Sequence, residues 1–407
     1  MNKKLTDKQA AKRQSAMAKI DNVFKKANEA GLNKKGKERV GDSTYEQYSE
    51  TVKRYYEYAS KKYNIHNPSK LKQKHFESYL EDEVISKWRD GEVSVAFSVR
   101  KTIAAVDAFK TATSHFNDFK GQVDAIDHDK ALGILKENYI TRKADYTGTM
   151  IGSAEITNEM YKELDKMANR THHAVVAKDA FEVARTTGAR VEDILKLTPA
   201  DIKGDEIEFR NGKGNLTARV RLNDDAKAVL KRLSEGKKDN EPLITLYRNN
   251  MKNQAYGREQ AANKLTQLIG SASSKALKNL GMSEEKTVKY AYKGSDGRKH
   301  YANTTVKTSY TMHSGRKEFA QNEYKRYMSM NLKEIDKILS EYKELGGNYE
   351  RGIEKLNNSY NNKVNKCLLL AAFQIRHFRT DVISQYYVDK GDLKNDRKEF
   401  CNRTKKI

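Results

Sequence analysis

Prolines are almost absent from this sequence, and their scarcity constrains the fold more than any other feature. Only Pro68, Pro199 and Pro242 occur among 407 residues. Because a proline removes a backbone donor and clashes with the preceding helical turn, long stretches without proline are free to be helical. Alanine, lysine, glutamate and leucine, which favour helices, are abundant in those stretches. The sequence therefore predicts a mainly helical protein of roughly two to three domains.

The spacing of apolar residues divides the chain into parts. Apolar residues recur at helical spacing over about 6–30, 43–63, 75–88, 94–116, 156–167 and 174–187. The stretch 141–153 mixes small, polar and basic residues, which is typical of a linker. We expect a basic N-terminal helix or tail at 1–41, a helical domain at 42–140, a linker at 141–153 and a second domain at 154–407. For the N-terminal segment, a packed helix and a solvated tail are equally open.

Two stretches of the second domain change to the period of a β-strand. Apolar residues alternate with charged ones over 207–222, and Asn211-Gly212 supplies a turn signal, so a β-hairpin with Lys213 at its tip is predicted. A second alternating stretch at about 287–306 predicts another hairpin. The fold class that follows is mainly α with a small β-sheet or hairpin.

A pair of amphipathic helices is predicted at about 331–366, on either side of Gly346-Gly347. Their apolar stripes must be covered. We predict that they contact another protein, and packing on their own domain is the open alternative. The last residues, 388–407, are also expected to dock on a neighbouring subunit.

The charge of the chain favours nucleic acid as its partner. Lys and Arg number 78 against 55 Asp and Glu, which gives a formal charge of +23. Candidate DNA contacts in the helical domain at 42–140 are cationic, although a solvated face is the more common role of such residues: Lys53, Arg54, Arg100, Lys101 and Lys110.

Other classes of function find little support. The longest apolar run, 367–373, is too short to span a membrane, and the N-terminus lacks the apolar region of a signal peptide. We expect an intracellular, cytoplasmic protein with no membrane partner. Cys367 and Cys401 stand apart, without CxxC or histidine-rich company, so neither a disulfide framework nor a metal site is predicted.

Three short motifs place residues suited to phosphate chemistry in one order. Thr187-Gly188-Ala189-Arg190 puts an arginine after a glycine turn, and Asp193 follows it. His313-Ser314-Gly315-Arg316 puts a histidine and an arginine on one face of a helix. In the third, His377 precedes Tyr386 by nine residues, with Tyr387 one place further.

Together these motifs resemble the tyrosine recombinase (phage integrase) family. Its boxes are T-G-x-R, H-x-L-R and G-H followed nine residues later by tyrosine, and its G-K-G hairpin is matched at Gly212-Lys213-Gly214. Gly315 replaces the usual leucine, and Arg376 stands where glycine is usual. The 61 residues from Arg316 to His377 also exceed the usual spacing.

The resemblance implies a SAM-like helical core-binding domain at 42–140 and an α+β catalytic domain at 154–407. It implies DNA cleavage and rejoining through a 3′-phosphotyrosine, without cofactor or metal. In the roles that it implies, Arg190 and Arg316 clamp the phosphate, and Lys213 is the general acid. His313 assists proton transfer, His377 binds the phosphate, and Tyr386 is the nucleophile. Asp193 would orient neighbouring cations.

The family further implies double-stranded DNA attachment sites, a homotetramer, a bacterial or phage-borne mobile element and an accessory directionality factor. Two alternatives stay open. One is a catalytically silent DNA-binding regulator, a repressor on the same fold, to which the departures at Gly315 and Arg376 point. The other is a type IB topoisomerase, which shares the chemistry without pairing two sites.

Overall fold

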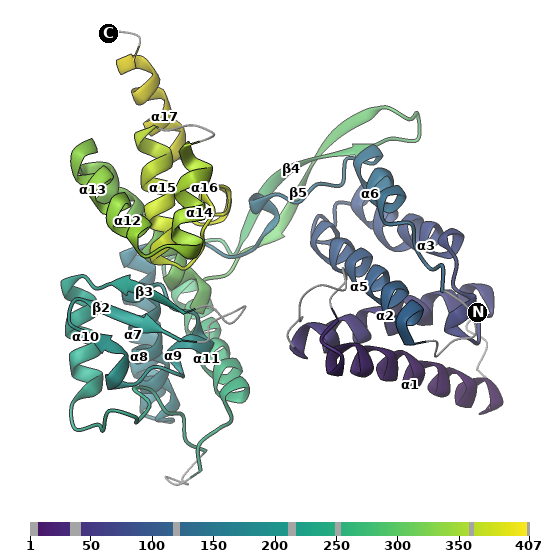
Figure 1. Ribbon diagram of the computed structural model, residues 1–407, viewed down its shortest axis with the longest axis horizontal. Helices are drawn as coiled ribbons and strands as arrows, with labels where there is room; N and C mark the ends of the chain where they lie inside the picture. The colour runs from purple at the N-terminus through teal and green to yellow at the C-terminus, as the bar shows by residue number, and fades with distance from the viewer. Residues whose placement is uncertain are drawn as a thin grey trace. The chain divides into compact units, whose positions relative to one another are not determined.

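The structure is a computed structural model that describes residues 7–32, 42–116, 123–210, 217–248, 254–357 and 362–404. The chain forms two compact units, each with its own core. Unit 1 comprises 1–147 and 287–306, and unit 2 comprises 148–286 and 307–407. The first change of unit, at Thr147-Gly148, falls inside the predicted linker. Figure 1 shows helices with small antiparallel sheets, so the predicted fold class is confirmed.

Unit 1 is built on helices that pack through aromatic and aliphatic side chains. Helix α1 is packed on α2 and α5 and buries Ile20 and Phe24, so residues 7–29 of the N-terminal segment form a packed helix and not a solvated tail. Rings of Tyr55, Phe76 and Tyr79 meet edge-on or tilted within this core. The helices are α1 (Asp7–Glu29), α2 (Asp42–Tyr63), α3 (Gln73–Leu80), a π-helical turn (Glu81–Ile85), α4 (Ser86–Arg89), α5 (Val95–Phe116) and α6 (His128–Glu137).

A β-hairpin from the distant stretch 287–306 completes unit 1. Its strands are β4 (Glu285–Lys293) and β5 (Lys299–Lys307), as the alternating pattern predicts. The Trp88 indole donates to the Ala291 carbonyl at 2.9 Å, and the Tyr290 hydroxyl donates to the Arg89 carbonyl at 3.0 Å. The rings of Trp88 and Tyr290 meet edge-on at 5.5 Å. The hairpin is therefore part of the core of unit 1, although its sequence lies within the predicted second domain.

Unit 2 holds helices around a three-stranded antiparallel sheet. The register pairs Ile207 with Val220 and Phe209 with Ala218, and all four side chains are buried. Its strands are β1 (Ile202–Lys203), β2 (Glu206–Phe209) and β3 (Ala218–Arg221). Its helices are α7 (Ala154–Ala168), α8 (His173–Thr187), α9 (Val191–Ile194), α10 (Asp224–Ser234), α11 (Arg258–Asn279), α12 (Met312–Ser329), α13 (Leu332–Glu344), α14 (Gly347–Asn357), α15 (Lys363–Gln374), α16 (Thr380–Tyr386) and α17 (Lys390–Thr404).

The predicted pair of amphipathic helices, α13 and α14, covers its apolar stripes within unit 2. Ile335 and Tyr342 of α13 and Ile353 of α14 are buried in the core that also holds Phe373 of α15. The rings of Tyr342 and Phe373 lie 5.0 Å apart. The helices therefore pack on their own domain, and the reason for predicting a partner protein at these stripes is removed. None of the helices in the described ranges is long and apolar enough to cross a membrane.

Replacing Trp88 with alanine is expected to destabilise unit 1 by about 3–5 kcal/mol, because it removes a fully buried indole and its bond to the hairpin. Trp88→Phe keeps much of the ring packing but leaves the Ala291 carbonyl unpaired, at a cost of about 1–3 kcal/mol. Urea unfolding followed by far-UV circular dichroism measures both. Equal stability of Trp88→Ala and wild type would contradict this account of the hairpin.

Candidate active site

The first candidate box lies where α8 ends. Gly188 has φ +63°, and a Cβ atom there would lie 2.5 Å from the Phe319 ring and 2.9 Å from the Ile375 side chain. Glycine is therefore required both for the left-handed turn and for the close packing of α12 and α15. After this turn Arg190 begins the short helix α9. Its guanidinium lies 3.8 Å from the Asp193 carboxylate and keeps part of its surface exposed.

The second box is the first turn of α12, which carries His313 and Arg316. This turn packs closely on α8, because a Cβ atom at Gly315 would lie 3.2 Å from the Phe181 ring. A leucine, which the family resemblance leads one to expect there, would require the Phe181 ring to move by at least a few tenths of an ångström. The departure at Gly315 thus has a packing reason within this chain.

Arg316 joins the three boxes. Its side chain is 1% exposed, and its terminal nitrogens donate to the carbonyls of Gly188 and Ile375. These carbonyls lie at the end of α8 and directly after α15. Burial lowers the pKa of Arg316 to about 10, and the electrostatic interaction with Tyr387 acts in the opposite direction. The guanidinium therefore remains charged at neutral pH, and each terminal nitrogen keeps a further N–H.

Arg376 is a second buried guanidinium beside the first. It has φ +55°, stacks on the Phe209 ring at 3.9 Å and donates to the Gly188 carbonyl at 3.3 Å. The Asp193 carboxylate lies 3.1 Å from it and offsets its charge. Burial, followed by the charge of Arg316, lowers the pKa of Arg376 to about 9. The Asp193 carboxylate thus lies beside two cations, Arg376 closely and Arg190 at longer range.

The third box brings a tyrosine to the other residues, and that tyrosine is Tyr387. Its hydroxyl lies 3.4 Å from His377 Nε2, its ring meets the His313 ring at 5.4 Å, and the Arg316 guanidinium lies 5.9 Å from its ring centroid. Tyr386 is half-buried and packs against the core of unit 2. Within the described residues, no hydrogen bond or ring contact joins Tyr386 to the histidines or arginines of the site.

Both histidines are held in the neutral form. Desolvation, followed by the charge of Arg316, lowers the pKa of His313 to about 4, although part of this residue is exposed. The same two causes lower the pKa of His377 to about 3, and Arg190 adds to the effect. A phosphate between the arginines would oppose this repulsion and raise both pKa values.

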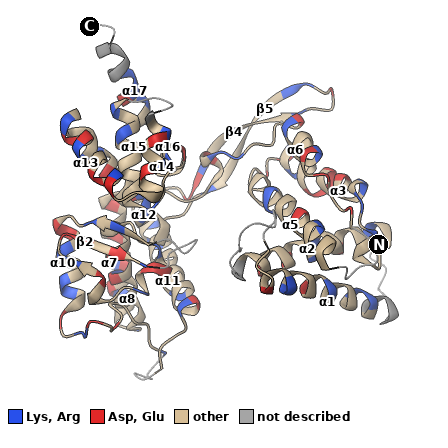
Figure 2. Cartoon of the chain, viewed as in Figure 1, with Lys and Arg blue, Asp and Glu red and all other residues tan. Residues whose placement is uncertain are grey.

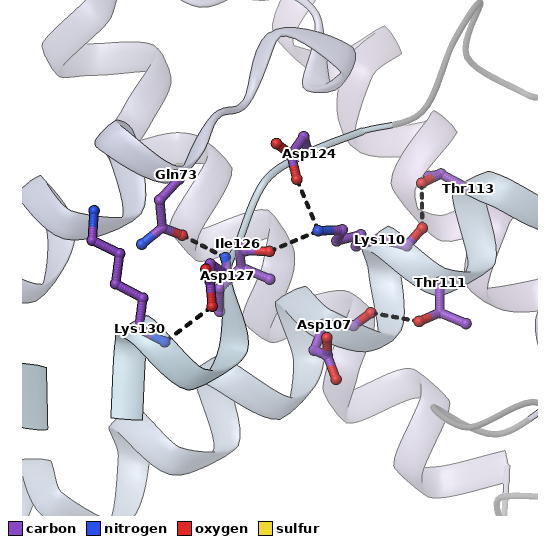
Figure 3. A network of polar contacts seen from close by, with 9 residues as sticks. All are labelled: Gln73, Asp107, Lys110, Thr111, Thr113, Asp124, Ile126, Asp127 and Lys130. Carbon is purple, nitrogen blue, oxygen red and sulfur yellow. Dashed lines mark hydrogen bonds and ion pairs between the residues drawn. The ribbon is translucent and has the colours of Figure 1, made fainter. Parts of the chain in front are cut away.

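Lys213, the predicted general acid, lies outside the described residues, as does the Asn211-Gly212 turn. The basic residues predicted to contact DNA in unit 1 differ in their surroundings. Lys110 donates to Asp124 at 2.8 Å and to the Ile126 carbonyl at 3.0 Å (Figure 3). Lys53 pairs with Asp21 and Glu50.

The other three candidates are less neutralised. Lys101 donates to the Gln47 amide oxygen at 2.8 Å, and Arg54 donates to Thr51 at 3.4 Å. Arg100 is exposed. Carboxylates thus offset the charges of Lys53 and Lys110, which makes these two the weaker candidates for phosphate contacts.

Two residues of the site were missed by sequence reasoning. Arg376 was noticed only as a departure from glycine, and its burial against Asp193 and Phe209 was not foreseen. The family spacing of nine residues predicts Tyr386, whereas Tyr387 follows His377 by ten positions. The adjacent pair Tyr386-Tyr387 was the available signal, because successive residues at the end of a helix point in different directions.

Comparisons with known proteins give distant structural likenesses. No protein-family model matches the chain, and no curated protein matches its sequence. A lambda integrase dimer bound to a COC' core site is similar with 15% identity and a TM-score of 0.47, over 76% of this chain and 89% of that chain. The XerH site-specific recombinase bound to a palindromic difH substrate is similar with 14% identity and a TM-score of 0.46, over 95% of this chain and 87% of that chain.

The Tn1549 transposon integrase in complex with circular intermediate DNA is similar with 12% identity and a TM-score of 0.41, over 93% of this chain and 98% of that chain. Because these likenesses are distant, the function proposed below depends on the residues of the site. Among the described residues, no group of three or more His, Cys, Asp and Glu side chains could hold a metal ion.

Substituting Asp193 with asparagine is expected to destabilise unit 2 by about 3 kcal/mol, because it leaves the buried charge of Arg376 without its counterion. In an Arg376→Gly background, the same change should cost much less, since glycine tolerates φ +55° and carries no charge. A double-mutant cycle measured by urea unfolding gives the coupling. Additive effects would show that the two side chains do not depend on each other.

The pH dependence of stability should report the neutral state of His377. Its pKa in the folded chain is about 3, below the ordinary value of 6.5. Between these values the unfolded chain binds a proton that the folded chain does not, so stability falls as pH decreases below about 6.5. In His377→Gln, the free energy of unfolding between pH 7 and pH 5 should fall less steeply than in wild type. Parallel pH curves would refute the lowered pKa.

Proposed function

We propose that this chain is a site-specific DNA recombinase that breaks and rejoins strands through a tyrosine covalently bound to phosphate. One observation carries the proposal. The buried, charged Arg316 has His313, His377 and the Tyr387 hydroxyl around it, while Arg190 adds positive charge nearby. Such a set offers a nucleophile, proton carriers and cationic donors for a phosphate in transfer.

We further propose Tyr387 as the nucleophile in place of the Tyr386 that family spacing favours. Of the two tyrosines, Tyr387 has its hydroxyl within hydrogen-bonding reach of His377 in the described part of the chain, and the Arg316 guanidinium lies 5.9 Å from its ring centroid. A phenol is a poor nucleophile at neutral pH and needs such neighbours. Family spacing remains the support for Tyr386.

The proposed reaction is balanced within DNA and protein. The tyrosine oxygen forms a bond to phosphorus as the bond from phosphorus to the 5′ oxygen breaks, and the phenolic proton passes to a neutral histidine of the site. The leaving 5′ oxygen takes a proton from Lys213, a role assigned by the family resemblance alone. Guanidinium groups stabilise the charge on the nonbridging oxygens. The phosphotyrosine bond retains the energy needed for rejoining a second strand end.

The partner in this proposal is double-stranded DNA carrying attachment sites, bound by a homotetramer and belonging to a mobile element. A net charge of +23 supports a polyanionic partner. The tetramer, the mobile element and an accessory directionality factor are supported by the family resemblance only.

A silent DNA-binding regulator is the second candidate, and one observation favours it. Both terminal nitrogens of Arg316 already donate to backbone carbonyls, which reduces the donors left for a phosphate. The two candidates predict the same basic character but differ in covalent chemistry.

Covalent trapping distinguishes them. Nicked duplexes tiled across the DNA on both sides of the gene should yield a protein–DNA adduct with wild type, because loss of the short strand past the nick prevents rejoining. Tyr387→Phe should abolish the adduct and Tyr386→Phe should retain it, as judged on denaturing gels. Mass spectrometry of the adduct should locate the nucleotide on Tyr387.

The other outcomes are equally informative. An adduct that survives Tyr387→Phe and is lost in Tyr386→Phe would restore the family spacing and refute the assignment to Tyr387. DNA binding without any adduct on fragments that are bound specifically would favour the regulator. Mobility shifts with each variant show that the substitutions leave binding intact.

A further inference from the structure

The hairpin β4–β5 presents a cationic, aromatic face that the proposed active site does not use. Within 287–306 there are four Lys or Arg residues and one acidic residue, Asp296. Blue segments mark Lys and Arg residues along the hairpin in Figure 2. Asp296 itself is occupied, because its carboxylate accepts from the His300 ring at 2.9 Å and from the Arg298 backbone at 3.0 Å.

The two faces of the hairpin have different surroundings. On one face, Val288 and Tyr290 are buried in the core of unit 1, and Thr304 lies against Gly91, where an added Cβ atom would come within 2.9 Å of its hydroxyl oxygen. Residues at the alternate positions are exposed, as the period of a strand requires: Thr287, Lys289, Lys299, Tyr301, Asn303 and Thr305. These six residues are called the outer face below.

The outer face contains a large exposed aromatic ring between two cations. Tyr301 is 58% exposed. The Lys289 ammonium lies 4.9 Å from its ring centroid, and the Lys299 ammonium lies 5.2 Å from it. The Lys299 ammonium also lies 4.9 Å from the Tyr139 ring centroid, and in the described part of the chain no ion pair joins either lysine to a carboxylate. Their positive charge is therefore available to an external anion.

The outer face is also held in place. Besides the bonds of Trp88 and Tyr290, the Tyr146 hydroxyl donates to the Lys289 carbonyl at 3.4 Å, and Arg89 Nε donates to the Lys293 carbonyl at 3.3 Å. A surface fixed by its backbone loses little conformational freedom when it binds a partner.

We propose that the outer face of the β4–β5 hairpin binds the phosphate backbone of duplex DNA. This inference rests on the proposed function, since it assumes that DNA is the partner. Lys289 and Lys299 supply ammonium groups to phosphate oxygens, while Tyr301, Asn303 and Thr305 supply neutral hydrogen-bonding groups beside them. A two-stranded ribbon has dimensions that fit along a DNA groove. Because these contacts reach the backbone, they add affinity without sequence preference.

Salt-dependent binding tests the proposal. Fluorescence anisotropy with a labelled random-sequence duplex gives the association constant of the full chain at several salt concentrations. Lys289→Ala/Lys299→Ala should bind several-fold more weakly at low salt. The slope of log K against log salt concentration should decrease in magnitude by about 2, since roughly one counterion is released per phosphate contact. Tyr301→Ala should weaken binding while leaving that slope unchanged.

A matched control removes the same charge from lysines of unit 1 that already have acidic partners. Lys61 pairs with Glu57 at 2.8 Å, and Lys130 pairs with Glu77 at 2.6 Å. Lys61→Ala/Lys130→Ala should retain the wild-type slope. If the hairpin variant and this control behave alike while wild type binds DNA, the hairpin proposal is overturned and the proposed function stands. If wild type shows no binding, the proposed function fails as well.

One further result would also overturn the proposal. The outer face would instead be a contact between copies if the hairpin variant lost self-association in analytical ultracentrifugation and kept wild-type DNA affinity. Thermal unfolding of each variant verifies that the exposed substitutions leave the fold intact.

Discussion

The carbonyl groups that accept hydrogen bonds from Arg316 hold unit 2 in the arrangement on which the candidate site depends. A buried guanidinium is costly without hydrogen-bond acceptors, and here two carbonyls from distant parts of the chain each accept from one of its terminal nitrogens. One follows α8 and the other follows α15. The bonds therefore fix three segments relative to one another. Gly188 makes this possible, because any side chain there would collide with Phe319 and Ile375.

The cations around Arg316 differ in how closely a carboxylate approaches them. Asp193 offsets the charge of buried Arg376 and only approaches Arg190, whose guanidinium remains partly exposed. Burial, followed by the excess of positive charge, lowers the pKa of both histidines and keeps them neutral. Such a site is unfavourable for a cation and favourable for an anion, and its charges are arranged before any anion enters. This preorganisation is what transfer of a charged phosphate requires.

Sequence reasoning was successful where local patterns decide the structure. Helical periodicity placed α2, α5, α7 and α8, and the period of two placed strands β2, β3, β4 and β5. The order of the motifs brought Arg190, His313, Arg316 and His377 into one prediction. The family spacing selects Tyr386, and it carries no information on Tyr387, because the direction of each ring depends on the end of α16 and on packing against His313. Nor could sequence reasoning foresee that α13 and α14 bury their stripes against Phe373, or that Arg376 is paired with Asp193. These outcomes depend on contacts between residues that are far apart in the chain.

The return of the hairpin 287–306 to unit 1 has a consequence for how the protein is made. Trp88 and Tyr146 share an edge-on ring contact, and each also bonds to a strand of the hairpin. When residues up to 147 have left the ribosome, this aromatic cluster still lacks the two strands against which it packs. The nascent chain must add the whole of 148–286 before the missing strands emerge. Although it comes first in the sequence, the N-terminal unit cannot complete its folding first.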